Sequence, residues 1–254
     1  MNKLLSRRKL LTAGLTTAAG ASGLGLAVRL ADRYGLIPPD HGGIYGVGET
    51  LTYASQRLLM SLGSRAREFD RSQISKVAVV NGKPPQNETY ERLLAGKFAE
   101  WRLTLDGLVA RPSSFSLAEL RQYPSSSQIT HLACEEGWSF IAEWTGVPLS
   151  HVLNLVEVLP QAKYAVYFSL DQGWWDSMDM AEAWHPQTLL AYRMNGQELP
   201  AGHGAPVRLR VPRQLGYKNV KHLSRITITD NLKNFGKGLG STAPESGYSW
   251  YAGI

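Results

Sequence analysis

The stretch HLACEEGWS, residues 131–139, joins the end of a predicted β-strand to the only cysteine in the chain. Residues 129–133 have the length and composition of a short strand, and Cys134 follows them directly. The Glu-Glu-Gly sequence after the cysteine predicts a loop. The thiol is therefore expected at a loop mouth, where functional groups concentrate in folded proteins.

Short strands outnumber helices on both sides of this stretch, which predicts a mixed, β-rich α+β fold. Aromatic and β-branched residues dominate residues 164–170, while residues 207–211 and 225–229 alternate apolar and polar side chains. Residues 101–109 also alternate and contain an Asp-Gly pair, which predicts a hairpin turn. Further predictions are a strand over 76–80, helices over 52–69 and 147–158, and a capping box from Ser116 to Glu119 that opens a short helix.

Composition places the chain among globular proteins. It has 254 residues, of which 43% are hydrophobic and 19% charged, so disordered, collagen-like and coiled-coil classes are excluded. A single cysteine excludes an internal disulfide, a zinc site built on cysteine pairs and a CxxCH haem attachment. No linker composition interrupts residues 75–230, which indicates one domain over that range.

The positive charge is concentrated at the N-terminus. The net charge is +6, and residues 1–33 contain six basic side chains and one acidic one, which leaves +1 for the rest. A nearly neutral body argues against a nucleic-acid partner. The adjacent Arg7 and Arg8 precede an uncharged stretch over 10–28, a pattern typical of a twin-arginine export signal. An uncleaved membrane anchor is the alternative.

These features divide the chain into three parts: a signal or anchor over residues 1–33, an N-terminal segment over 34–73 and a folded domain with a C-terminal tail over 74–254. The N-terminal signal predicts a periplasmic or exported protein, with membrane tethering if the signal stays attached.

Cys134 allows three interpretations. A lone cysteine is commonly a small buried hydrophobe. It could instead be a nucleophile with His131 or His203 as its base, or a soft ligand for a transition metal. Glu135 and Glu136 would raise the pKa of the thiol and disfavour a free thiolate, whereas a bound metal cation would force its deprotonation.

Residues 202–221 contain a second candidate site. Small residues surround His203 and allow the backbone to approach a ligand closely. Arg208 lies on a predicted strand, and Lys218 and Lys221 follow on a glycine-containing loop. Basic side chains and exposed amides form a natural anion cradle. Solvated charges on an edge strand are the alternative.

Several motifs together resemble the sulfite oxidase superfamily of molybdopterin enzymes, in particular its exported single-domain bacterial branch, which includes catalytic subunits of periplasmic methionine-sulfoxide reductases. The resemblance spans residues 74–232, and the motifs occur in the family's order. They are WRLTLDGLV (101–109), CEEGWS (134–139), WTGVPL (144–149), PQTLLAYRMNG (186–196), HGAPVR (203–208) and GYKNVK (216–221).

The resemblance implies a molybdenum-molybdopterin cofactor. It implies that Cys134 binds molybdenum, that His203 and Arg208 hold the pterin and its phosphate, and that Asn219 and Lys221 belong to the phosphate-side loop. Ser169 or Asp171 matches a polar position that contacts the pterin. The family's earliest cofactor-binding motif has no match before residue 80, where only Tyr53, Gln56 and Arg57 are candidates by position.

The implied activity is oxygen-atom transfer at sulfur, either sulfoxide reduction or sulfite-type oxidation, on a small-molecule substrate. Molybdenum supplies redox chemistry that side chains lack. A separate electron-transfer protein, either a haem protein or a membrane subunit, is expected because the resemblance does not extend to a haem domain. A non-catalytic relative that keeps the fold as a binding module is the alternative function.

Overall fold

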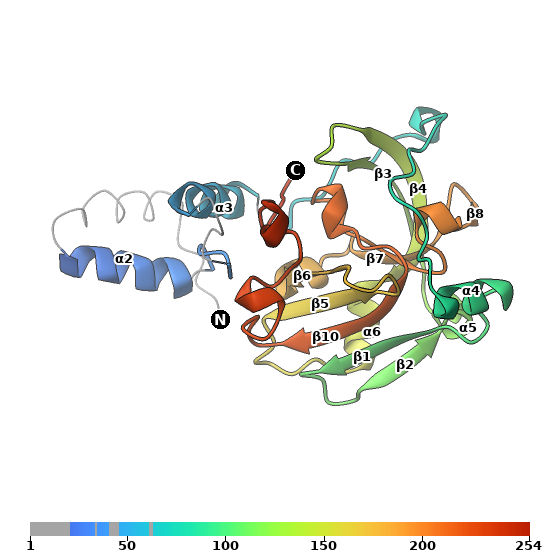
Figure 1. The fold of residues 1–254 in the computed structure, drawn as a ribbon. Helices are drawn as coiled ribbons and strands as arrows, with labels where there is room; N and C mark the ends of the chain where they lie inside the picture. The colour runs from blue at the N-terminus through green and yellow to red at the C-terminus, as the bar shows by residue number, and fades with distance from the viewer. Residues whose placement is uncertain (1–20, 34, 41–45, 61–62) are drawn as a thin grey trace.

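The computed structural model describes residues 21–33, 35–40, 46–60 and 63–254, and two sheets form its framework (Figure 1). In the first sheet, β1 and β10 pair in parallel and the other neighbours pair antiparallel. In spatial order this sheet contains β2 (Ser113–Ser116), β1 (Arg102–Gly107), β10 (Leu223–Thr229), β5 (Tyr164–Ser169) and β6 (Trp175–Asp179).

The second sheet is antiparallel throughout and carries the strand that leads to Cys134. It contains β3 (Ser126–Ala133), β4 (Ser139–Pro148), β7 (Leu189–Met194) and β8 (Gln197–Glu198), and β9 (Arg208–Arg210) also pairs with β7. With the helices around them, these sheets confirm the predicted mixed α+β fold.

Short helices connect the strands, while two longer ones lie beside the sheets at the N-terminal end (Figure 1). The α-helices are α2 (Ala21–Arg33), α3 (Val47–Leu59), α4 (Glu88–Ala95), α5 (Leu117–Gln122), α6 (Leu149–Leu155) and α7 (Met180–Ala183). The 3₁₀ turns are η2 (Arg71–Gln73), η3 (Ala201–His203), η4 (Gly216–Lys218), η5 (Gly236–Gly238) and η6 (Pro244–Ser246). Within the described ranges, no helix combines the length and apolar character that a bilayer span requires. The Arg7-Arg8 pair lies outside the described residues.

The main core lies under the first sheet and explains why its strands alternate. Leu103 and Leu105 of β1 are fully buried, whereas the neighbouring Arg102 and Thr104 point outward. Period-two burial of this kind is the signature of a sheet with one covered face. The core therefore fixes the strand register that positions the loops at the sheet ends.

Most strand predictions are confirmed, and so is the capping box. The predicted strands at 129–133, 164–170, 207–211 and 225–229 match β3, β5, β9 and β10 within a few residues. Ser116 Oγ accepts a hydrogen bond from the Glu119 amide at 3.1 Å, and the Ser116 amide donates to Glu119 Oε2 at 2.7 Å. Local side-chain chemistry thus decides where α5 begins.

The predicted Asp-Gly hairpin turn is wrong. Gly107 is the last residue of β1, and the chain continues along β10, where the Leu108 amide donates to the Ile228 carbonyl at 2.8 Å. Gly107 has a φ of +86°, and a Cβ added there would lie 2.1 Å from that carbonyl oxygen. Glycine is therefore required by close approach of two parallel strands rather than by a turn.

Three other element predictions need correction. Residues 76–80 form no strand, and the Val77 side chain is 75% exposed because no neighbouring strand covers it. The predicted helix over 52–69 ends at Leu59 in α3, and further along Phe69 donates its amide to the Ile129 carbonyl of β3. The predicted helix over 147–158 begins only after Pro148, because the preceding residues pair with β7 as part of β4.

Candidate active site

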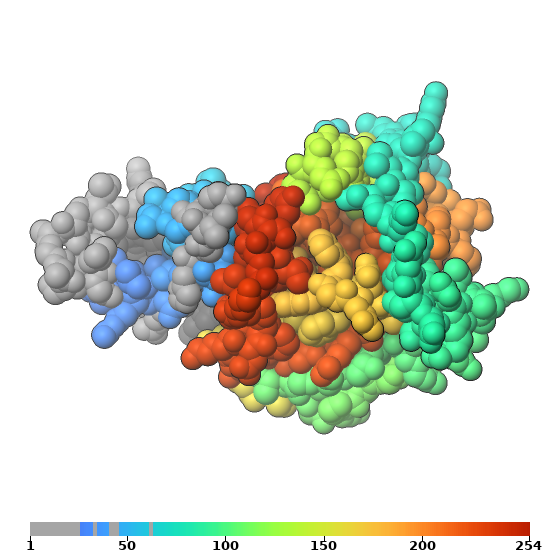
Figure 2. Space-filling model, viewed as in Figure 1, coloured from blue at the N-terminus to red at the C-terminus, as the bar shows by residue number. Residues whose placement is uncertain are grey.

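A cavity of about 430 Å³ opens where β3, β5 and the segment around β9 end. Figure 2 shows this face hollowed between the C-terminal segment in red, the loop after β5 in gold and the segment near residue 80 in teal. All seven residues predicted as site residues line this one cavity: Cys134, Ser169, Asp171, His203, Arg208, Asn219 and Lys221.

A tight turn after β3 presents the Cys134 thiol at the cavity wall. The Cys134 amide donates to the Trp138 carbonyl at 2.9 Å, and Gly137 closes the turn with a φ of +92°. Cys134 Sγ donates to Glu135 Oε2 at 3.2 Å. Burial, assisted by the adjacent Glu135 and Glu136 carboxylates, raises the pKa of the Cys134 thiol to about 11.

This pKa disfavours the nucleophile interpretation of Cys134. A thiol with a pKa near 11 is protonated at neutral pH and is a poor nucleophile. Of the two proposed bases, His203 lines the cavity, whereas His131 lies on β3 with its ring against Phe69. A metal cation would reverse the balance, because coordination removes the thiol proton.

Two buried arginines place positive charge behind the cavity. Arg208 donates to the His203 carbonyl at 3.0 Å and to the Asn219 carbonyl at 2.9 Å, and its guanidinium lies 5.0 Å from the centre of the Trp144 ring. Arg210 donates to Asn219 Oδ1 at 2.5 Å. No carboxylate of the described residues forms an ion pair with either guanidinium. Arg208 lines the cavity, so its charge is available to an anion there, whereas Arg210 does not line it.

Burial first, and the neighbouring cations second, lower the pKa values of two further groups in the cavity wall. Burial and the charge of Arg208 lower the pKa of Lys221 to about 8. Burial, with Arg208 and Lys221 nearby, lowers the pKa of His203 to about 4, so its ring is neutral at pH 7. Lys221 Nζ also donates to the carbonyls of Asn81 and Gly202, at 2.6 and 2.7 Å.

Asn219 holds the arginine strand and the following loop together. Its Oδ1 accepts from Arg210 and from the Val211 amide at 2.7 Å, and its Nδ2 donates to the Leu215 carbonyl at 2.9 Å. On the opposite loop, Ser169 Oγ accepts from the Asp171 amide at 2.9 Å. Both Ser169 and Asp171 line the cavity, so the structure does not separate the two alternatives for this position.

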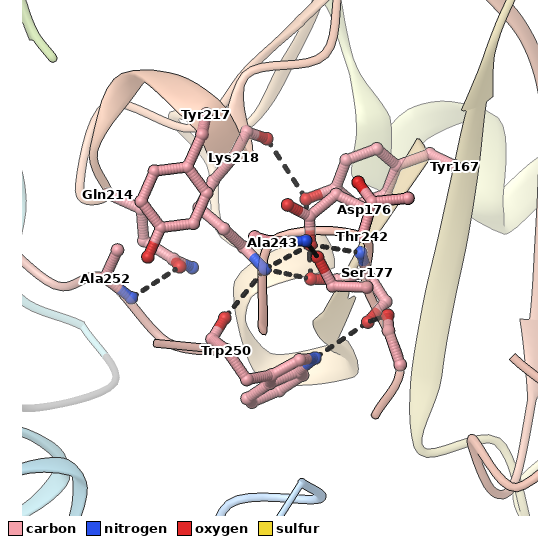
Figure 3. Close-up of polar contacts among 12 residues, drawn as sticks. Tyr167, Asp176, Ser177, Gln214, Tyr217, Lys218, Thr242, Ala243, Trp250 and Ala252 are labelled. Atoms are coloured by element: carbon pink, nitrogen blue, oxygen red, sulfur yellow. Dashed lines mark hydrogen bonds and ion pairs between the residues drawn. The ribbon is translucent and has the colours of Figure 1, made fainter. Parts of the chain in front are cut away.

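Lys218 does not belong to the anion cradle that the sequence predicts. Its ammonium group is buried and bonds to Asp176 Oδ1 at 2.5 Å and to the carbonyls of Ser177 and Trp250 at 2.7 Å each (Figure 3). The Trp250 indole donates to Ser177 Oγ at 2.8 Å. These bonds attach the C-terminal segment, which contributes part of the cavity wall.

Sequence reasoning missed much of the remaining lining. His222 lines the cavity, and its Nδ1 bonds to the Ala205 carbonyl at 2.8 Å. The aromatic lining residues are Trp138, Phe140, Trp174, Tyr217 and Tyr248. Trp174 follows a glycine in a polar loop, which is a weak local signal, and no local signal marks Tyr248.

The N-terminal candidates lie elsewhere. Tyr53 and Gln56 line a second cavity of about 350 Å³ between α3 and the C-terminal segment. Arg57 forms an ion pair with Asp179 at 3.0 Å. The second cavity shares Glu135, Tyr217 and Tyr248 with the first, so α3 lies beside the main cavity. None of the three α3 candidates lines the main cavity itself.

The residues present fit an anionic cofactor that carries a metal. Arg208 and Arg210 each leave a buried Nε without a partner, and neither charge is neutralised by a described carboxylate. The Cys134 thiol stands in the same cavity as a soft metal ligand. Cationic hydrogen-bond donors are the groups that bind phosphate most strongly.

These features fit a protein whose cavity, between the ends of the two sheets, takes an anionic cofactor. The family model described as "Oxidoreductase molybdopterin binding domain" matches residues 92–235. The chain belongs to this molybdopterin-binding family, and the match includes all seven predicted site residues.

Named relatives share parts of the chain. YedZ1 of Azospira oryzae, named as a candidate protein-methionine-sulfoxide reductase subunit, is 40% identical over 61% of this chain and 56% of its own length. MsrP of Ralstonia nicotianae, named as a protein-methionine-sulfoxide reductase catalytic subunit, is 34% identical over 51% of this chain and 44% of its own length. The chain thus spans about half the length of these relatives.

A solved structure supports the same fold. The sulfane dehydrogenase SoxCD from Paracoccus pantotrophus superimposes with a TM-score of 0.51 and 28% sequence identity. The superposition covers 52% of this chain and 39% of the SoxCD chain.

Proposed function

We propose that this protein is a molybdenum-molybdopterin oxidoreductase that transfers an oxygen atom at sulfur. One observation carries the proposal: the Cys134 thiol shares a cavity with the buried Arg208 and the half-buried Lys221, neither of which forms an ion pair with a described carboxylate. The names of the relatives, which are sulfoxide reductase subunits and a sulfane dehydrogenase, support sulfur as the reacting element.

Each proposed role follows from a position in the cavity. Cys134 Sγ binds molybdenum as a thiolate, which the metal charge stabilises despite the raised pKa of the free thiol. Arg208 and Lys221 attract the cofactor phosphate, and neutral His203 hydrogen-bonds the pterin. Asn219 fixes the arginine strand in place. Ser169 or Asp171 offers polar contacts from the opposite loop.

The bound cofactor supplies two-electron oxygen-atom transfer, which side chains cannot perform. In the reductive direction a sulfoxide, two electrons and two protons give a thioether and one water. In the oxidative direction sulfite and water give sulfate, two protons and two electrons. A separate haem protein or membrane subunit would supply or accept the electrons. The chain itself binds and orients the reactants.

We also propose an exported location. The Arg7-Arg8 pair and the uncharged stretch after it support the twin-arginine route, which carries proteins that have folded around a cofactor. The same stretch would tether residues 74–254 to the membrane if it stays attached. Comparing the N-terminal sequence of the mature protein with that of an Arg7→Lys, Arg8→Lys variant tests both points.

The functional proposal is tested on protein purified from cells that make molybdopterin. We expect about one molybdenum and one released pterin per chain, with turnover of sulfoxides by a reduced dye or of sulfite by an oxidised one. Cys134→Ser should lose at least about 100-fold in kcat, because the metal loses its protein ligand, while the urea midpoint changes little.

Two results would contradict the proposal. If Cys134→Ser keeps its turnover with metal bound, the thiol is not the ligand. A protein that holds the full cofactor but turns over neither sulfoxides nor sulfite would support the non-catalytic binding module instead.

A further inference from the structure

Charge is unevenly distributed along the depth of the main cavity. Arg208 is buried in the cavity wall, and Lys221 is half-buried beside it. Carboxylates outnumber cations among the exposed lining residues, which are Glu136 and Asp171 against Lys83. The cavity mouth is therefore negative where its floor is positive.

Two aromatic side chains stand at this mouth with much of their surface in solvent. Trp174 is 45% exposed and Tyr248 is 39% exposed, and both line the cavity. Tyr248 packs its ring 5.3 Å from Tyr217, which lies deeper in the wall. Exposed aromatic surface at a cavity mouth is available to contact an apolar group of a ligand.

The loop after β5 holds Trp174 in this position. The Ser169 amide donates to the Trp174 carbonyl at 3.0 Å, and the Trp174 amide donates to the Asp171 carbonyl at 3.1 Å. The next residue, Trp175, turns inward, and its ring lies 5.9 Å from that of Phe168. Trp175 therefore packs against the core, whereas Trp174 lines the cavity.

We propose that Trp174 and Tyr248 form an apolar platform that binds the organic substituents of a neutral sulfoxide or thioether. The platform determines specificity, and it makes organic sulfur compounds better substrates than sulfite. This inference rests on the proposed sulfur oxygen-atom transfer. Aromatic rings bind sulfur and its alkyl groups favourably, whereas the two exposed carboxylates at the mouth, Glu136 and Asp171, repel a small dianion such as sulfite.

The first test measures KM and kcat separately for methyl phenyl sulfoxide. Trp174→Ala should raise KM about tenfold, the effect of losing a contact of about 1.4 kcal/mol, with kcat within about twofold of the parent. Trp174→Phe should recover most of the loss. Trp184→Ala is the matched control, because Trp184 is 37% exposed and does not line the cavity.

A second test needs no turnover. Without an electron donor, methyl phenyl sulfoxide should quench the tryptophan fluorescence of the parent protein saturably, and the Trp174→Phe variant should lose this quenching. Cofactor content must be equal in the two proteins.

The outcomes separate the two proposals. The platform is overturned if Trp174→Ala leaves KM unchanged, if quenching is absent, or if the parent has a lower KM for sulfite than for methyl phenyl sulfoxide. Saturable quenching at Trp174 in loaded protein that transfers no oxygen would support the platform and reject the proposed function.

Discussion

Arg208 shows what a single residue contributes to this site. Its guanidinium is almost completely buried, yet its donors reach only two backbone carbonyls, and burial lowers its pKa to about 9. A buried cation without a counter-charge costs folding free energy. Binding of an anion in the cavity recovers that cost, so Arg208 links cofactor affinity to fold stability.

Arg208→Ala should therefore lower cofactor retention more than it lowers stability. We expect the ratio of pterin to protein to fall about tenfold or more, as the loss of a charge-assisted hydrogen bond of about 1.5–3 kcal/mol implies. Pterin released from purified protein is the measurement. Arg193→Ala is the control, since Arg193 is an exposed arginine paired with Glu198. Equal occupancy in the two variants would refute the role of Arg208.

At the scale of elements, local sequence predicted strands well and their connections poorly. Alternation in β1 and β10 reports the covered face directly, because each apolar side chain meets the same core. The Asp106-Gly107 pair led to the wrong prediction of a hairpin turn. A glycine that permits a positive φ in a turn also permits a neighbouring strand to approach closely. Only the parallel partner β10, more than 100 residues away, distinguishes the two cases.

Gly107→Ala tests this explanation of the strand pair. The added methyl group would meet the Ile228 carbonyl oxygen at 2.1 Å, and the φ of +86° adds strain. We expect a loss of about 2 kcal/mol or more in the free energy of unfolding.

The matched control is Gly196→Ala, at a φ of +75° with no atom within 4 Å of the added carbon. Gly196→Ala should lower the free energy of unfolding only by the cost of placing an alanine at a positive φ. Urea denaturation of both variants is the measurement, and an equal loss would show that strand contact plays no part at Gly107.

At the scale of the molecule, the cavity joins segments that are distant in the sequence. The positions of Cys134 and the His203–Arg208 motif in a cavity could be predicted from residue type and immediate neighbours alone. Cys134 is a soft metal ligand after a strand, and Arg208 is a cation close to small residues. The burial of Lys218 could not, since its partner Asp176 lies 42 positions away and the Trp250 carbonyl 32 positions away. Without these contacts, a lysine on a glycine-containing loop resembles a phosphate ligand.

Lys218→Met should loosen the C-terminal segment. Removing the cation leaves the buried Asp176 carboxylate without its charge partner, which costs about 3–5 kcal/mol. The double variant Lys218→Met, Asp176→Leu should recover part of this loss. Urea denaturation measures the stability, and limited proteolysis near residues 240–250 measures the attachment of the segment. A double variant as unstable as the sum of the two single variants would contradict the coupling.

Acid stability involves more than one part of the molecule, because His203 and His222 line the main cavity whereas His185 bonds to the Ser64 carbonyl and does not line it. Burial lowers the pKa of each of His185, His203 and His222 to about 4, below the ordinary value of 6.5. Because these pKa values are lower in the folded state, the unfolded chain takes up protons at a higher pH than the folded protein does. These groups therefore contribute stability above pH 6.5, which is lost as the pH falls towards about 4.

Glu182 acts in the opposite direction. Burial raises the pKa of its carboxyl to about 7, so its contribution is present below pH 4.5 and is lost as the pH rises through about 7. Burial also raises the carboxyl pKa values of Glu49 and Asp176, so these two groups and Glu182 oppose the fall in the urea midpoint that the three histidines cause between pH 6.5 and about 4. Glu182→Gln should steepen that fall because it removes one of the opposing groups, whereas His185→Gln should make it shallower. If His185→Gln leaves the pH dependence of the urea midpoint unchanged, His185 is not held neutral by the fold.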